Sequence, residues 1–354
     1  MTTTVVKLLR PGVRAGLALL SGIPLTLYGV LHTAYGGVVL GGLTALVGLS
    51  LLGLAAWIPW QARGSGSWRS RLVAAPALLL GVFFIVLPVC IGITETQKWR
   101  SDVGSPPSAA YRDVSFRAAD GVRISGWYRP SRNGATVLVA HGGGSDRRGS
   151  VAHASMLARH GYGVLLWDAR GRGRSEGVQN AWGWGWPKDV EGALAFLRRQ
   201  PGVDMSRVGG LGLSTGADVL VQVAGTGDGL RAVVADGTVA SSFADVKRVF
   251  GVDAMTPFFA AEFATVRLTS GTRPGPTLAD VMPRITAPTL LVAAGPQEQP
   301  AGRHYDRAAG DAPVSVWYLP KVGHTAAIRE VPAEYERRVT RFFDAALAAP
   351  RSAP

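Results

Sequence analysis

The stretch that decides the fold reads RVGGLGLSTGADVLVQVA and spans residues 207–224. Its first part is a short apolar run that ends at Leu213, and its last part, residues 217–224, has the composition of a helix. Between them stands the pentapeptide Gly-Leu-Ser-Thr-Gly at 212–216. A serine at such a strand-to-helix turn has an exposed hydroxyl, and flanking glycines let the backbone pass closely. The stretch therefore predicts a strand, a sharp turn carrying Ser214, and a helix.

Strands and helices alternate on both sides of this stretch. Continuous apolar strands separated by helices indicate a mostly parallel sheet covered on both faces, with the active site beyond the carboxyl ends of the strands. The predicted strands are 113–117, 122–128, 135–140, 163–167, 207–213, 232–235, 288–293 and 314–319. The predicted helices are about 147–160, 189–200, 215–225, 302–309 and 332–348.

The N-terminal hundred residues have a different composition. Residues 15–62 contain no charged residue, and neither do residues 72–94. A helix of roughly 20 apolar residues crosses a bilayer. We therefore expect a membrane anchor over 1–100, with about three transmembrane helices near 15–33, 37–59 and 72–94. A cleaved signal peptide is the alternative, but its apolar region would be shorter and would not repeat.

Basic residues in the short loops predict the orientation of these spans. Positive residues favour the cytoplasmic side, and the expected hairpin between the first two spans has none. An N-terminus inside and three spans would place the rest of the chain outside the cytoplasm, in the cell-wall space of a bacterium, whereas an even number would reverse this. The residues that support it are Lys7, Arg10 and Arg14 before the first span and Arg63, Arg69 and Arg71 between the second and third.

Charge and cysteine content exclude other classes of protein. The net charge is +13, but much of the excess flanks the apolar runs, and the rest shows no RNP signature, zinc-finger spacing or compact basic block. We therefore expect no nucleic-acid partner. Cys90 is the only cysteine, which excludes an intrachain disulfide and a cysteine-based metal site. The chemistry expected below requires no metal and no organic cofactor.

A second glycine-rich turn follows the predicted strand that ends at Ala140, and it begins with His141. In acyl transfer, negative charge develops on the carbonyl oxygen, so the site needs preorganised N–H donors. We expect one donor to be the backbone N–H of Thr215 and the other that of Gly143, with Gly144 as the alternative. A flexible turn without a role is the competing interpretation.

The chain resembles the α/β-hydrolase superfamily, in the branch of the dienelactone hydrolases and prolyl-oligopeptidase-like enzymes. The likeness covers about 110–348 and implies an α/β-hydrolase fold. The segments that carry it occur in the family's order and read HGGGSDR at 141–147, DARGRGRS at 168–175, GLSTG at 212–216 and Gly-His at 323–324.

The resemblance also implies a catalytic triad. Of the six histidines, it assigns the base to His324, which follows the last strand, and gives His141 a structural role. The family's acid follows the penultimate strand, where this chain reads Gly-Pro-Gln-Glu at 295–298. Glu298 is therefore the expected acid, and Asp236, after the preceding strand, is the alternative.

The expected organisation is a membrane anchor, a linker at 101–110, and a hydrolase domain at 111–349 with a short cap insertion near 237–287. The expected activity is that of a serine hydrolase acting on a small-molecule or lipid-like carboxylic ester. A serine peptidase, an acyltransferase and a catalytically silent membrane scaffold are the alternatives, because a triad does not distinguish leaving groups.

Overall fold

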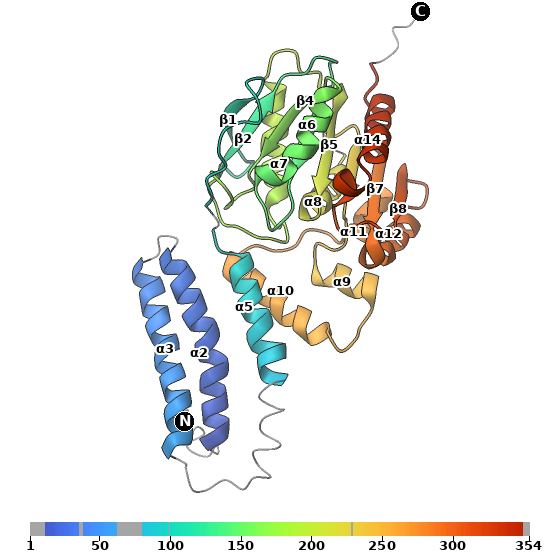
Figure 1. Ribbon diagram of the computed structural model, residues 1–354. Coiled ribbons are helices and arrows are strands. Elements are labelled where there is room, and N and C mark those ends of the chain that lie inside the picture. Colours follow the sequence, from blue (N-terminus) through green and yellow to red (C-terminus); the bar gives the residue numbers. More distant parts are fainter. Residues whose placement is uncertain (1–10, 35–37, 62–79, 99, 228, 350–354) are drawn as a thin grey trace, which may run out of the picture. The chain divides into compact units, whose positions relative to one another are not determined.

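The computed structural model describes residues 11–34, 38–61, 80–98, 100–227 and 229–349 (Figure 1). The chain divides into two compact units. One unit consists of Met1–Gln97 together with Val252–Gly271. The other consists of Lys98–Gly251 and Thr272–Pro354. We call the first the helical unit and the second, after the family that the sequence resembles, the hydrolase unit.

The hydrolase unit is built on one eight-stranded sheet with the order β1-β2-β4-β3-β5-β6-β7-β8. Only β2 runs against its neighbours, and the strands from β3 to β8 are parallel. The predicted mostly parallel sheet is confirmed. Its strands are β1 (Arg112–Arg117), β2 (Arg123–Arg129), β3 (Thr136–Ala140), β4 (Gly163–Trp167), β5 (Val208–Leu213), β6 (Val233–Asp236), β7 (Thr289–Ala294) and β8 (Val314–Leu319).

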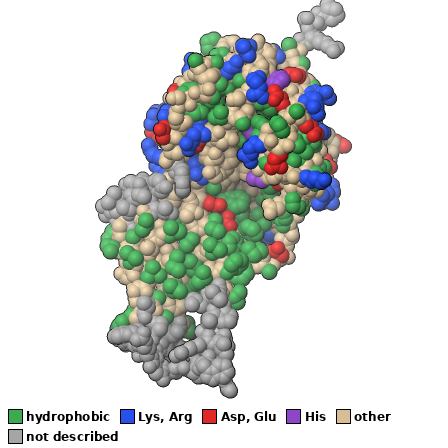
Figure 2. All heavy atoms as spheres, in the orientation of Figure 1, with side chains coloured by type: hydrophobic (Ala, Val, Ile, Leu, Met, Phe, Trp, Pro, Cys, Tyr) green, Lys and Arg blue, Asp and Glu red, His purple; other side chains and the backbone are tan. Residues whose placement is uncertain are grey.

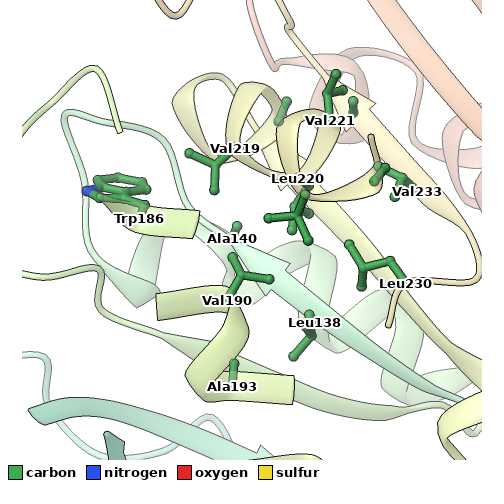
Figure 3. Close-up of a cluster of buried hydrophobic side chains, with 14 of the residues drawn as sticks. Leu138, Ala140, Trp186, Val190, Ala193, Val219, Leu220, Val221, Leu230 and Val233 are labelled. Carbon is green, nitrogen blue, oxygen red and sulfur yellow. The ribbon is translucent and has the colours of Figure 1, made fainter. Parts of the chain in front are cut away.

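Helices cover both faces of this sheet. One face packs against α7 (Trp186–Arg198), α8 (Thr215–Ala224) and α12 (Gly295–Ala309), and the other against α6 (Val151–Arg159) and α14 (Pro332–Ala346). Figure 3 shows part of the first layer, where Leu138 of β3 lies among side chains of α7 and α8. Each fully buried leucine or valine there contributes about 1.5–3 kcal/mol of apolar transfer free energy. The shorter elements are η2 (Arg147–Ser150), η3 (Met205–Arg207), α9 (Phe243–Phe250), α11 (Leu278–Val281), η4 (Met282–Arg284) and α13 (Ala327–Glu330).

One predicted boundary is wrong in a way that concerns the site. The helix expected at 302–309 begins at Gly295, so the expected loop at 295–298 is the first turn of α12. Pro296 lies at the start of the helix, where a missing N–H costs nothing. The Glu298 Oε2 atom accepts a hydrogen bond from the Ala294 N–H at 2.6 Å, which satisfies a donor at the helix start. The two features stabilise helix in a segment whose prolines and glycine suggest a loop.

The helical unit contains α2 (Pro11–Ala34), α3 (Val38–Gln61), a π-helical turn η1 (Val82–Val86), α5 (Leu87–Glu95) and α10 (Thr256–Ser270). Within the described residues, one segment is long and apolar enough to cross a membrane, Val13–Val30. Gly42–Ala55 and Val82–Glu95 are apolar but shorter. Length and composition thus support one of the three expected spans. Residue 37 of the second expected span and residues 72–79 of the third lie outside the described residues.

The expected cap at 237–287 does not form one body. Its α9 and α11 belong to the hydrolase unit, whereas α10 belongs to the helical unit. The insertion therefore contributes to both units of the chain. The surfaces of the two units differ: Figure 2 shows hydrophobic side chains gathered over the helical unit, and charged side chains over the hydrolase unit.

Candidate active site

The turn between β5 and α8 holds Ser214 in an uncommon conformation. Its φ is 52° and its ψ is −121°, a region that non-glycine residues rarely adopt. The backbone segments of the turn lie too close together for side chains at either glycine. A Cβ on Gly212 would lie 2.4 Å from the Gly216 carbonyl oxygen, and a Cβ on Gly216 would lie 2.6 Å from the Ala140 carbonyl oxygen. The Ser214 N–H donates to the Asp236 carbonyl at 2.8 Å. Such strain clusters at functional sites, and it fits a serine held at an elbow.

His324 and Glu298 complete a hydrogen-bonded series with this serine. The His324 Nε2 atom lies 2.9 Å from the Ser214 Oγ atom, and its Nδ1 atom lies 2.5 Å from the Glu298 Oε1 atom. A carboxylate can only accept, so Nδ1 donates and Nε2 accepts the serine proton. Glu298 is buried while the His324 side chain is half exposed. The hydrogen bond that His324 donates to Glu298 raises the pKa of His324, against a smaller opposing effect of burial.

Asp236, the alternative acid, lies at the end of β6 and makes no hydrogen bond to His324. It is fully buried, and neither carboxyl oxygen has a hydrogen-bond partner in the described part of the chain. Burial raises the pKa of Asp236 to about 7, and the Glu298 charge adds to this, while the nearby Tyr335 hydroxyl acts in the opposite direction. The Tyr335 hydroxyl and the Asp236 carboxyl group nevertheless do not form a hydrogen bond. The structure thus brings Glu298, and not Asp236, to the histidine.

The glycine turn after β3 lies against the serine elbow. A Cβ on Gly142 would lie 3.4 Å from the Ser214 Cβ atom, and one on Gly143 would lie 2.7 Å from the Thr215 Oγ1 atom. Thr215 is the first residue of α8, and N–H groups in a first helical turn have no intrahelical acceptor. The glycine turn and the start of α8 therefore lie next to each other beside the serine, and these are the two segments expected to supply N–H donors for an oxyanion.

Buried polar groups fix this turn in place. The Ala169 N–H donates to the His141 Nε2 atom at 3.0 Å, and the His141 Nδ1 atom donates to the Gly142 carbonyl at 2.7 Å. Burial lowers the pKa of His141, so the ring is neutral and has a structural role. The Arg172 guanidinium donates to the Gly143 carbonyl. This contact is not predictable from the sequence, although Arg172 belongs to the arginine-rich segment that carries the family resemblance.

Sequence reasoning also missed Gly237, the residue after β6. Its φ is +85°, and a Cβ at this position would lie 2.8 Å from the His324 Cε1 atom and 3.1 Å from its Nδ1 atom. The absence of a side chain at Gly237 therefore leaves room for the imidazole. The sequence signal was a glycine directly after a strand-ending aspartate, a pattern too common to assign alone.

Comparisons with known proteins place this geometry in a class. The sheet order and the Ser-His-Glu series are those of an α/β-hydrolase. Residues 108–309 match the X-Pro dipeptidyl-peptidase (S15) family. Because the match covers more than half of the chain, the protein belongs to this family. The match includes Ser214 and Glu298 and ends before His324.

Individual relatives cover parts of the chain. It is 34% identical over 146 residues to the uncharacterized protein YfhR of Escherichia coli K12, which is 39% of this chain and 50% of YfhR. It is 34% identical over 109 residues to the thiohydrolase aneE of Aspergillus aculeatus, 30% of this chain and 34% of that protein. The chain thus spans half the length or less of these two relatives.

Among solved structures, the Pyrococcus furiosus esterase Pf2001 superposes with a TM-score of 0.56 at 22% identity, over 71% of this chain and 98% of the esterase. At this identity the likeness concerns the fold alone.

Proposed function

We propose that this protein is a membrane-anchored serine hydrolase that cleaves carboxylic esters through an acyl-enzyme on Ser214. One observation carries the proposal. The serine stands in a strained elbow with its Oγ atom 2.9 Å from the His324 Nε2 atom, while the Nδ1 atom of the same ring lies 2.5 Å from Glu298. Nucleophile, base and orienting carboxylate within hydrogen-bond reach of each other form the arrangement that activates a serine.

The geometry supports a defined sequence of steps. The Ser214 Oγ atom attacks the ester carbonyl carbon as its proton moves to the His324 Nε2 atom. Glu298 stabilises the resulting imidazolium through Nδ1–H and holds the ring in the correct tautomer. The N–H groups of Thr215 and of Gly143, or of Gly144 in its place, stabilise the oxyanion. His324 then protonates the leaving alkoxide, and a water activated by the same ring releases the acid and restores Ser214.

The choice of ester over amide is part of the proposal. One solved structure of the same fold is an esterase, and the Aspergillus relative is named a thiohydrolase. The family match favours a second candidate, a serine peptidase that releases X-Pro dipeptides. Both use the same serine, and they differ in the leaving group and in recognition of a free N-terminus.

Turnover by the purified full-length protein distinguishes the two. We expect hydrolysis of p-nitrophenyl acetate and butyrate with kcat/KM at least 100-fold above that for Ala-Pro-p-nitroanilide. Ser214→Ala should abolish both activities. Preference for the dipeptidyl anilide would establish the peptidase, and turnover that persists in Ser214→Ala would refute the assignment of the nucleophile.

Membrane attachment and orientation belong to the same proposal. The absence of charged residues from α3 and from residues 15–34 of α2 supports it, as does the segment Val13–Val30, which meets the length and composition of a span. The basic residues around the expected spans favour a hydrolase domain outside the cytoplasm of a bacterial cell. Protease added to intact cells should then degrade the hydrolase domain, and complete protection until lysis would contradict the orientation.

A further inference from the structure

The helix α10, which comes from the cap insertion, packs along α5 inside the helical unit (Figure 1). The Phe83 and Phe258 rings lie 5.5 Å apart, and the Thr96 hydroxyl donates to the Thr269 hydroxyl at 2.8 Å. These contacts advance in the same direction along both segments, so the two helices run parallel. An insertion of the hydrolase fold thus has its packing partner in the apolar N-terminal region.

Small residues bring the two backbones close together. A Cβ on Gly92 would lie 2.8 Å from the Thr265 Cβ atom and 2.9 Å from the Glu262 carbonyl oxygen. Gly92 and Thr96 are one turn apart on one chain segment, as are Thr265 and Thr269 on the other. Close approach at small residues, with hydroxyl hydrogen bonds across the interface, is how helices associate within lipid.

The outward surface of this unit is suited to hydrocarbon. On α10, Leu268 is 82% exposed beside the exposed Arg267, whereas the carboxylate-bearing Glu262 is buried. An arginine next to an exposed apolar side chain can extend to the headgroup layer. Figure 2 shows the same apolar character over the face in view. Exposed apolar side chains elsewhere in the unit are Val13, Leu17, Val30, Leu43, Leu46, Val47, Leu49, Leu54, Trp57, Leu80, Phe83, Ile85 and Leu87.

The length of α10 limits where it can lie. Fifteen residues extend about 22 Å at 1.5 Å per residue, which is less than the ~30 Å of a bilayer core. The helix cannot span, so it fits a position in one leaflet beside α5, with Arg267 toward the polar layer.

The chain connects α10 to the catalytic edge of the sheet at both ends. The insertion begins after β6, which ends at Asp236, and it ends before β7, which leads to Glu298. Where the chain returns to the hydrolase unit, the Thr272 hydroxyl accepts a hydrogen bond from the Asn180 side chain at 3.0 Å. The next residue, Ala181, accepts one from the Thr215 hydroxyl at 2.8 Å.

We infer that α10 is a bilayer-embedded part of the cap, and that the substrate is a membrane-resident amphiphile, an ester with a long acyl chain. The substrate class rests on the proposed esterase function, whereas the position of α10 does not. A long-chain ester in the same leaflet is at high local concentration beside α10. The chain that follows α10 is hydrogen-bonded to Asn180, whose neighbour Ala181 is hydrogen-bonded to Thr215. A short ester dissolved in water has no need of that helix.

The position of α10 is tested without any activity. In a Cys90→Ala background, Leu268→Cys and the exposed Ala264→Cys are each labelled with the environment-sensitive fluorophore NBD, in phosphatidylcholine–phosphatidylglycerol vesicles that contain doxyl lipids. Val178→Cys, an exposed apolar position of the hydrolase unit, is the matched control. We expect doxyl quenching of at least half of the signal at both α10 positions and less than one tenth at 178. Quenching at α10 no greater than at the control would overturn the inference.

The substrate class is tested by a variant that separates the two helices. At Gly92 even a Cβ atom would lie 2.8 Å from the Thr265 Cβ atom, so Gly92→Leu forces the two helices apart. Gly53→Leu makes the same change on α3, where nothing lies within 4 Å of the Cβ position. In the same vesicles we expect Gly92→Leu to lower kcat/KM for an embedded palmitoyl ester at least 10-fold and for p-nitrophenyl acetate less than twofold. Gly53→Leu should change neither.

These experiments distinguish a wrong substrate class from a wrong esterase function. An equal loss on both esters, or no loss on either, would overturn the assignment of a membrane-resident substrate while leaving the esterase intact. If wild type turns over neither ester and a fluorophosphonate fails to label Ser214, the proposed function itself is wrong and the substrate class falls with it. The quenching result still decides the position of α10.

Discussion

The missing side chain at Gly237 leaves room for the catalytic histidine, and Gly237→Ala would fill that space. The new methyl group would lie 2.8 Å from the His324 Cε1 atom and 2.9 Å from the Thr325 Cγ2 atom. Ordinary contacts of a Cβ begin at 3.4 Å, so the imidazole must retreat by about 0.6 Å. Its hydrogen bonds to Ser214 and Glu298, at 2.9 and 2.5 Å, leave no slack for such a movement. Misplacement of a reacting group by 1 Å can cost roughly 100-fold in rate, so we expect kcat to fall about 10- to 100-fold.

Backbone strain must be separated from this steric effect. Gly237 has a φ of +85°, where a non-glycine residue costs about 1–2 kcal/mol. Gly121 has the same φ with nothing within 4 Å of its Cβ position, so Gly121→Ala carries the strain without the contact. Both variants should lose about 1–2 kcal/mol in urea unfolding, and only Gly237→Ala should lose turnover of p-nitrophenyl butyrate. Turnover of Gly237→Ala within twofold of Gly121→Ala would refute the reasoning.

The remaining predictions concern the two carboxyl groups and the histidine. Glu298→Gln should lower kcat/KM for the ester by roughly 10³–10⁴-fold, because the amide cannot hold the same tautomer, whereas Asp236→Asn should lower it less than 10-fold; the reverse ranking would make Asp236 the acid. Wild-type kcat/KM should rise with pH as His324 loses its proton, with a midpoint above 6.5 because Glu298 raises the pKa of His324, and a profile whose midpoint does not fall in Glu298→Gln would contradict that cause. Since burial raises the pKa of Asp236 to about 7, the folded state keeps a proton that the unfolded chain releases near pH 4, so wild-type stability falls between these values as pH rises. Asp236→Asn should therefore add up to about 4 kcal/mol to the free energy of unfolding at pH 8 and little at pH 4, and an equal gain at both pH values would refute this.

The sheet could be predicted from the sequence because its strands are buried on both faces. Such strands are continuous apolar runs bounded by glycine or helix, and the run that ends at Leu213 is an example. The elbow at Ser214 was predictable for the same reason, since its chemistry depends on position directly after a strand. These features are local in the sequence.

Contacts between distant segments could not be predicted. The start of α12 at Gly295 depends on the Glu298 carboxylate accepting the Ala294 N–H, and that carboxylate is held by its bond to His324 as well. The partnership of α10 with the N-terminal helices depends on Gly92, far away in the chain. No periodicity within residues 237–287 indicates that partner.

The order of Glu298 over Asp236 was expected only by resemblance. Both residues follow strands at the same edge of the sheet, and both are buried. Only Glu298 makes a hydrogen bond to His324, and that contact depends on the path of α12 and of the turn at Gly323. The site was therefore predictable in its nucleophile and base, while its acid needed the three-dimensional structure.

Covalent labelling tests the central claim most directly. The full-length protein, treated with a fluorophosphonate and analysed by mass spectrometry, should carry one adduct, on the peptide that contains Ser214. Labelling should disappear in Ser214→Ala and slow by at least 100-fold in His324→Ala. Folded wild-type protein that does not react, or an adduct that persists in Ser214→Ala, would contradict the account.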